Sequence, residues 1–366
     1  MKIKITREIL LPVLQAANNV VERRQSLPIL SNVLFVAGDD GIQITATDME
    51  VELVSRIENN VAERGSAALP ARKLFDICRA LPSEAEMTID TSGTKAKIAS
   101  GRSRFSLAAM NADEFPSIGA FEASVNLELP TRTLADLLES TSFAMAHQDV
   151  RYYLNGLLLE IDGSRIRAVA TDGHRLAMTD KAVEVALDTP RQCIVPRKGV
   201  LEIVRLLNPS SETTQITVGE NHFRVNAGNQ SLTTKLVDGR FPDYERVIPR
   251  ETDNRVVASR EALRAGLSRA SILSNEKFRG IRLILKKNLL TAVAHNPEQE
   301  EAEEEIEVEY NGAAVEVGFN VSYLLDVLGV MRSDTVRLDL LDAQSSCLLQ
   351  TPDDATSRYV VMPMRL

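Results

Sequence analysis

Arg165-Ile-Arg-Ala-Val-Ala-Thr-Asp-Gly-His-Arg-Leu-Ala-Met178 has the pattern of a strand, a tight turn at Asp172-Gly173 and a second strand. The pattern occurs twice more, as Ile42-Gln-Ile-Thr-Ala-Thr-Asp48 and Leu289-Leu-Thr-Ala-Val-Ala-His-Asn296. Asp48, Asp172 and Asn296 occupy the same place in each copy, and both intervals are 124 residues long. A fixed period of this size indicates three repeated domains, which we expect at 1–122, 123–246 and 247–366.

A second landmark keeps nearly the same spacing. Leu69-Pro-Ala-Arg-Lys-Leu-Phe-Asp-Ile-Cys-Arg79 and Val195-Pro-Arg-Lys-Gly-Val-Leu-Glu-Ile-Val-Arg205 both place a proline before a basic pair and an apolar helical stripe. Phe319-Asn-Val-Ser-Tyr-Leu-Leu-Asp-Val-Leu328 keeps the stripe and lacks the basic pair. These landmarks predict the same order of elements in each repeat: a helix, strands, a second helix and more strands. We expect two helices and about eight strands per repeat. Because βα alternation is absent, the expected class is α+β with mostly antiparallel sheet.

Helical periodicity covers six windows, and the expected helices include Thr131–Met145, Arg197–Leu207 and Ser259–Leu273. Thr6 is a candidate N-cap for the first helix, and Pro12 predicts a short first turn or a kink there. The windows are 7–24, 71–81, 131–151, 196–207, 259–279 and 320–332, and they hold 17 Lys and Arg against 10 Asp and Glu. Since the net charge is −9, the rest of the chain carries −16. A basic surface built only from helices could face a phosphate backbone although the whole chain is acidic.

Composition and termini exclude several classes of protein. No apolar run approaches the roughly 18–20 residues that span a bilayer, and Met1–Arg7 alternates like a strand instead of forming a signal peptide. We therefore expect a cytoplasmic protein. Cys78, Cys193 and Cys347 are scattered, without disulfide or zinc-ligand spacing, and indicate structural thiols.

Catalytic and cofactor motifs are missing from the sequence. It contains no P-loop, Gly-x-Gly-x-x-Gly, Gly-x-Ser-x-Gly or His-Glu-x-x-His pattern. Asp172 and His174 could act together as a catalytic general base or bind a metal, which leaves a hydrolase as one alternative. The matching turns, Asp48-Met-Glu50 and Asn296-Pro-Glu298, do not keep the histidine. A structural Asx turn is therefore favoured, and we expect no catalytic residue, metal or cofactor.

Two segments of opposite charge are candidates for sheet edges. Glu298-Gln-Glu-Glu-Ala-Glu-Glu-Glu-Ile-Glu-Val-Glu309 is acidic, whereas Ser100-Gly-Arg-Ser-Arg-Phe-Ser-Leu107 alternates arginines with apolar residues. The acidic run is equally a solvated strand, and its spacing does not match an EF-hand cation loop. Opposite charges at two edges would steer head-to-tail pairing of two copies. The apolar end, Tyr359-Val-Val-Met-Pro-Met-Arg-Leu366, fits either a core strand or one wall of a groove.

These features together resemble one family, the bacterial sliding clamps, which are β subunits of DNA polymerase III. The resemblance covers the whole chain. It is carried by Leu27–Leu30, Gly101–Leu107, Met145–Gly156, Ala170–Leu176, Lys235–Tyr244, Ile272–Gly280, Asn296–Glu301 and Val360–Leu366. It implies a non-catalytic processivity factor: a head-to-tail homodimer that encircles double-stranded DNA without reading its sequence. Helices would line the hole, and the partners would be the replicative polymerase, the clamp loader and other proteins with a clamp-binding motif.

The resemblance also implies roles for individual residues. Its peptide groove corresponds to Leu154, Thr171, Gly173, His174, Arg175, Leu176, Pro242, Arg246, Val247, Phe278, Asn320, Tyr323, Ser346, Val360, Met362, Pro363, Met364 and Arg365. Gln344 stands where the family has a small apolar residue. Its DNA-facing positions correspond to Arg24, Arg72, Lys73, Arg79, Gln148, Tyr152, Tyr153, Arg197, Lys198 and Arg205. The expected dimer contacts are Arg102, Arg104, Phe105 and Leu107 against Ile272, Leu273, Glu298, Glu300, Glu301 and Glu304. A three-domain scaffold without a DNA role is the other alternative.

Overall fold

The computed structural model describes residues 1–22, 27–59, 61–184, 187, 189–207, 211–249, 254–352 and 354–365. Over these ranges each repeat has eight strands and two α-helices, as the sequence predicts. The first repeat contains β1 (Lys2–Thr6), α1 (Arg7–Val20), β2 (Asn32–Gly38), β3 (Gly41–Thr47), β4 (Val51–Ile57), β5 (Gly65–Pro70), α2 (Ala71–Ala80), β6 (Glu86–Ser92), β7 (Lys95–Ser100) and β8 (Ser103–Ala108).

The second repeat contains β9 (Ala123–Pro130), α3 (Thr131–Glu139), β10 (Gly156–Asp162), β11 (Arg165–Thr171), β12 (Arg175–Ala182), β13 (Arg191–Pro196), α4 (Arg197–Leu206), β14 (Thr213–Gly219), β15 (His222–Ala227) and β16 (Gln230–Lys235). The third contains β17 (Arg255–Ser259), α5 (Arg260–Ala270), β18 (Gly280–Lys286), β19 (Leu289–His295), β20 (Glu301–Glu307), β21 (Val315–Asn320), α6 (Val321–Val330), β22 (Thr335–Asp339), β23 (Cys347–Thr351) and β24 (Asp354–Val361). Short 3-10 helices that matter below are η3 (Ser142–Ala144), η5 (Tyr244–Val247) and η6 (Ser271–Leu273).

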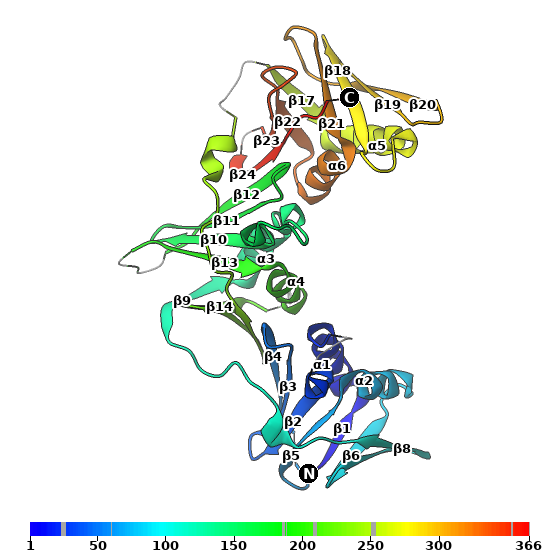
Figure 1. The fold of residues 1–366 in the computed structure, drawn as a ribbon, viewed down its shortest axis with the longest axis vertical. Helices are drawn as coiled ribbons and strands as arrows, with labels where there is room; N and C mark the ends of the chain where they lie inside the picture. Colours follow the sequence, from blue (N-terminus) through cyan, green and yellow to red (C-terminus); the bar gives the residue numbers. More distant parts are fainter. Residues whose placement is uncertain are drawn as a thin grey trace. The chain divides into compact units, whose positions relative to one another are not determined.

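The chain forms two compact units, and the first combines residues 1–135 with 198–236. Its sheets have the orders β1-β6-β7-β8 and β5-β2-β3-β4-β16-β15-β14-β9. Helix α1 packs against α2 and against β3 and β4, so both helices cover one side of the first repeat (Figure 1). In the larger sheet β4 of the first repeat pairs with β16 of the second, which joins the two repeats through backbone hydrogen bonds.

The second unit combines residues 136–197 with 237–366 and repeats this arrangement. Its sheets have the orders β13-β10-β11-β12-β24-β23-β22-β17 and β20-β19-β18-β21. Helix α5 packs against α6, β19 and β20 (Figure 1). Strand β12 of the second repeat pairs with β24 of the third, the same junction as between β4 and β16. The fourth strand of one repeat thus pairs with the last strand of the next, and β8 and β20 are left at sheet edges.

Pairing between these strands is antiparallel throughout the described ranges, which confirms the predicted class. Three helices end three or more residues before their windows predict. Helix α3 stops at Glu139, because the hydroxyls of Ser140 and Thr141 donate to the carbonyl oxygen of Leu137 at 3.2 and 2.6 Å. Such local side-chain bonds compete with the helical ladder, and η3 follows in place of the helix expected to Met145. Helix α1 ends at Val20, and α5 ends at Ala270, before η6.

The start of α1 differs from the sequence prediction in two details. Thr6 has the extended backbone of an N-cap, but its side chain makes no capping hydrogen bond. The helix runs through Pro12 to Val20 without the short first turn that proline predicts.

Candidate functional site

The turn that repeats through the sequence is held by its acidic or amide side chain. Asp172 Oδ1 accepts hydrogen bonds from the backbone N–H groups of His174 and Arg175 at 2.9 and 3.0 Å. Asp48 Oδ1 accepts two in the same way, at 2.9 and 2.7 Å, and Asn296 Oδ1 accepts one at 3.0 Å. The Asx-turn interpretation is therefore confirmed for Asp48 and Asp172, which accept from the residue two positions on, whereas Asn296 accepts from Glu300, four positions on. The imidazole of His174 stacks on Tyr323, with ring centroids 6.4 Å apart, and no catalytic pair with Asp172 is formed.

The same turn opens onto an apolar groove of about 200 Å³ between the second and third repeats. The groove is lined by Arg151, Tyr153, Leu154, Thr171, Gly173, Arg175, Leu176, Pro242, Asp243, Tyr244, Val247, Val360 and Met362. Nine of the residues predicted for the peptide groove are among them. They come from η4 (Tyr152–Leu154), β11, β12 and the turn between them, the 242–247 segment, β24 and the residue that follows it. Leu154, Leu176 and Val360 are nearly inaccessible, so the floor belongs to the hydrophobic core.

The other nine predicted groove residues lie around this cavity or beyond it. Met362 N–H donates to the carbonyl of His174 at 2.9 Å, and Met364 N–H donates to Gly318 at 2.9 Å, which fixes the path of the C-terminal segment. Asn320 caps α6, and Phe278 is 57% exposed. Ser346, Pro363 and Arg365 are at least partly exposed, and Gln344 lies in an exposed turn. Arg246 is exposed and paired with Asp243 at 2.7 Å.

Arg175 connects the groove to the helices of the third repeat. Its Nε binds Asp172 Oδ2 at 3.1 Å, its Nη1 binds Asp326 of α6 at 2.5 Å, and its Nη2 donates to the carbonyl of Phe143 at 2.8 Å. The guanidinium also lies over the ring of Tyr323, 4.5 Å from its centroid. These three hydrogen-bond partners and the ring of Tyr323 hold the guanidinium in one position, where it forms a polar rim of the apolar cavity.

A buried hydrogen-bond network lies beneath the opposite wall of the groove. The hydroxyl of Tyr244 donates to Glu160 and accepts from Arg167 Nη1 at 2.9 Å. Arg167 also forms a two-pronged ion pair with Asp180 at 2.5 and 3.0 Å. Burial, together with the hydrogen bond to Glu160, raises the pKa of Tyr244 to about 12, so the hydroxyl stays protonated and can donate. Tyr244 was not predicted from the sequence, because its role depends on which strands are neighbours.

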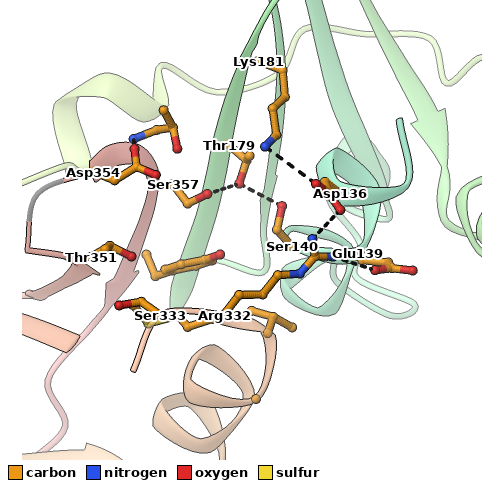
Figure 2. A pocket seen from close by; sticks show the side chains of 15 residues that line it. Asp136, Glu139, Ser140, Thr179, Lys181, Arg332, Ser333, Thr351, Asp354 and Ser357 are labelled. Atoms are coloured by element: carbon orange, nitrogen blue, oxygen red, sulfur yellow. Dashed lines mark hydrogen bonds and ion pairs between the residues drawn. The ribbon is translucent and has the colours of Figure 1, made fainter. Parts of the chain in front are cut away.

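Figure 2 shows a second pocket, of about 580 Å³, on the other face of the sheet that carries the groove. Thr179 of β12 faces this pocket, since successive residues of a strand point to opposite faces. Arg332 pairs with Asp136 at 2.7 Å and with Glu139 at 3.3 Å, and Lys181 lies 3.8 Å from Asp136. These charges are satisfied within the chain, and they brace α3 against the end of α6. The apolar groove is therefore the better candidate for binding a partner.

The predicted DNA-facing cations have two different environments. On α2, Arg72, Lys73 and Arg79 are exposed, although Asp76 lies 4.0 Å from Arg72 and 3.2 Å from Arg79. On α4, the ammonium group of Lys198 binds Asp48, Glu22 at 3.1 Å and the carbonyl of Val20 at 2.9 Å. Arg205 pairs with Glu202, and Arg197 donates to the carbonyl of Met145 at 3.0 Å. The cations of α4 thus also hold the structure together, whereas those of α2 are more available to a ligand.

Three further candidates for DNA contact, Gln148, Tyr152 and Tyr153, lie in one short segment. Tyr152 is 56% exposed and packs edge-on against Tyr153, with ring centroids 5.8 Å apart. Gln148, on the same loop, has a positive φ of 57°. Arg24 lies outside the described residues.

The two predicted dimer edges are free edge strands. Strand β8 lies at the end of its sheet and presents Arg104 and Phe105 to solvent, and β20 lies at the end of another. Ile272 on η6, close to β20, is 75% exposed, which is unusual for an isoleucine. Glu304 is bound by Arg269 of α5 at 2.6 and 2.8 Å, whereas Glu303 is exposed and was not predicted. Glu298, Glu300 and Glu301 are exposed, Arg102 is exposed and Leu107 is half-buried.

The described part of the chain contains no helix long and apolar enough to cross a membrane. No group of three His, Cys, Asp or Glu side chains in those ranges could hold a metal ion.

Comparison with known proteins gives one family for the whole chain. Residues 1–119, 128–243 and 245–365 match the N-terminal, central and C-terminal domains of the DNA polymerase III beta subunit. The beta sliding clamps of Pseudomonas aeruginosa and Escherichia coli K12 are 52% and 46% identical to it, each over 100% of both chains. A crystal structure of the Pseudomonas aeruginosa sliding clamp matches with a TM-score of 0.95 and 51% identity, covering both chains completely. A Bartonella birtlesii clamp bound to griselimycin matches with a TM-score of 0.96 and 34% identity, also over 100% of both. The chain therefore belongs to the DNA polymerase III beta subunit family, the bacterial beta sliding clamps.

Proposed function

We propose that two copies of this chain close head to tail into a ring of six clamp domains around duplex DNA. The ring tethers the replicative polymerase and other DNA-processing proteins, which makes synthesis processive, and performs no chemistry itself. The observation that carries this proposal is the repeated junction: β4 pairs with β16, β12 pairs with β24, and the equivalent strands β20 and β8 are left at edges. When two copies use these edges head to tail in a ring, neither β8 nor β20 is left unpaired.

The two junctions within the chain predict the register of the contact between copies. In the three repeats, the register pairs at the repeated turn are equivalent: Thr47–Glu52, Thr171–Leu176 and His295–Glu301. The first residues after the turns that precede β8 and β16, Ser103 and Gln230, are equivalent as well. Because Ser231 is opposite Val54, this equivalence places Arg104 opposite Glu303 of the other copy. Opposite charges directly across a strand pair stabilise it. At this position the acidic and basic edges are therefore complementary in charge.

The apolar side of the junction has a counterpart in the chain as well. Phe143 of η3 packs against Tyr359 of β24, with ring centroids 6.1 Å apart. The equivalent positions at the free edges are Ile272 of η6 and Phe105 of β8. Both are exposed in the single chain, and a dimer would bury them together, with Leu273 and Leu107 beside them.

The groove is the proposed site for partner peptides. Its floor is apolar, and its rim carries Arg175 and Arg246. A short peptide with a glutamine and two or more apolar side chains fits this arrangement, because the apolar anchors fill the cavity and the amide can bind rim groups and backbone. DNA would meet the exposed cations of α2 and the Tyr152 loop through its phosphates, without base readout. A bacterial replication clamp acts on the chromosome, so we expect it in the cytoplasm with the nucleoid.

Retention on DNA of different topology tests the ring. The protein is loaded by a clamp loader onto nicked circular DNA and separated from free protein by gel filtration, before and after one restriction cut. We expect it to remain on the circle and to leave the linear product by sliding off its ends. Equal retention on both forms would show direct affinity for DNA, and the encircling function would be wrong.

A further inference from the structure

The network under Tyr244 is one ordered row of polar side chains across four strands. Gln192, Glu160, Arg167 and Asp180 stand on β13, β10, β11 and β12, and each is the direct register partner of the next. Direct partners point to the same face of a sheet. Gln192 donates to Glu160 at 2.6 Å, and Arg167 makes its two-pronged pair with Asp180. The row is therefore continuous from one edge of the second repeat's sheet to β12.

The row also reaches out of the sheet, to the segment that forms one wall of the groove. Arg167 Nη1 donates to the hydroxyl of Tyr244 at 2.9 Å and to Glu245 Oε1 at 3.2 Å, and Tyr244 donates to Glu160. Both Tyr244 and Glu245 belong to η5, whose last residue is Val247. The side chain of Arg167 is only 9% exposed, so its bond to Tyr244 is shielded from water, whereas Glu245 is 71% exposed.

The ring of Tyr244 packs in the hydrophobic core, whereas its hydroxyl belongs to the polar row. It packs with Phe241 on the apolar residues Leu158, Val169 and Met178, which occupy the next row of the same face. A phenylalanine would fill this place equally well. The hydroxyl is therefore explained by the polar row: without it Glu160 would keep only its hydrogen bond from Gln192, and Arg167 Nη1 only its hydrogen bond to Glu245.

We infer that Tyr244, Glu160 and Arg167 act as positioning residues that hold the 242–247 wall in its peptide-binding shape. The inference rests on the proposed function of the groove and adds residues outside the predicted contact set. Pro242, Tyr244 and Val247 line the cavity, and the network fixes the segment that carries them. A wall that is already ordered binds more tightly, because no binding energy is lost in ordering it.

Replacing Tyr244 with phenylalanine tests this inference. Tyr244→Phe removes one oxygen and keeps the ring in the core. We expect the Kd of a fluorescent peptide with one glutamine and two apolar anchors to rise about tenfold, since the wall loses its fixed position. Tyr310→Phe is the matched control. Tyr310 is also buried and donates one hydrogen bond, to the carbonyl of Ala313 at 2.6 Å, but it lies outside the groove.

A second variant separates positioning from general stability. Glu160→Ala, which removes the acceptor of the Tyr244 hydroxyl, should weaken peptide binding by itself, and combined with Tyr244→Phe it should add little, because both changes break the same bond. Unchanged affinity in folded Tyr244→Phe, an equal loss in Tyr310→Phe, or fully additive losses would each overturn the inference. Absence of peptide binding by the unsubstituted protein would overturn the groove itself, whereas retention on circular DNA should be the same in every variant.

Discussion

At the scale of single residues, Asp172 shows why the repeated turn keeps an oxygen acceptor while its neighbours vary. The acceptor organises the backbone, and the charge is a separate contribution through the 3.1 Å pair with Arg175. Asn296 performs the backbone task in the third repeat without a charge. We therefore predict that Asp172→Ala lowers the free energy of unfolding by about 1–3 kcal/mol, because two backbone hydrogen bonds and the pair with Arg175 are lost, and that Asp172→Asn lowers it by less. Urea denaturation of both variants gives the comparison. An equal loss in both would mean that the ion pair, and not the turn, is the larger effect. Gly173 is fixed by the same geometry: its φ is +87°, and Met49 tolerates +78° at the matching place, so the turn requires this backbone more than it requires glycine.

At the scale of elements, the prediction concerns the edge strands β8 and β20. Arg104→Glu places two negative charges opposite each other in the proposed register and should convert the dimer into folded monomer; Glu303→Arg should do the same with two positive charges. Both changes together restore the opposite pair, and we expect the double variant to dimerise again in analytical ultracentrifugation. Recovery with Glu304→Arg in place of Glu303→Arg would show that the register is wrong. The sequence alone could predict both edge strands and their charges, because side-chain alternation and composition are local. It could not select Glu303, since opposite residues are known only once the register of neighbouring strands is known. The early end of α3 was missed for a related reason: apolar periodicity continues past Glu139, while two hydroxyl groups end the helix through bonds that periodicity does not include. The Arg167 row was hidden likewise, because its members lie far apart in the chain.

At the scale of the whole molecule, the net charge of −9 limits how DNA can be held. A chain of this charge has weak direct affinity for a polyanion, and added salt weakens phosphate contacts further, by orders of magnitude for several contacts. A closed ring removes that limit, because DNA leaves it only when an interface opens or an end is reached. The cations of α2 are then needed to guide DNA during loading, and less so afterwards. We predict that Arg72→Ala with Lys73→Ala slows loading onto circular DNA several-fold, while the loaded protein stays on the circle through a high-salt wash as long as the unsubstituted protein does. Lys95→Ala with Lys97→Ala is the control, since it removes the same charge from exposed positions of β7. The readout is the amount of protein on the circle with time during loading, and then during the wash. Loss of the α2 variant during the wash would show that its cations, and not ring closure, retain the DNA; equal slowing by the β7 variant would show that total charge, and not its place on the helices, governs loading.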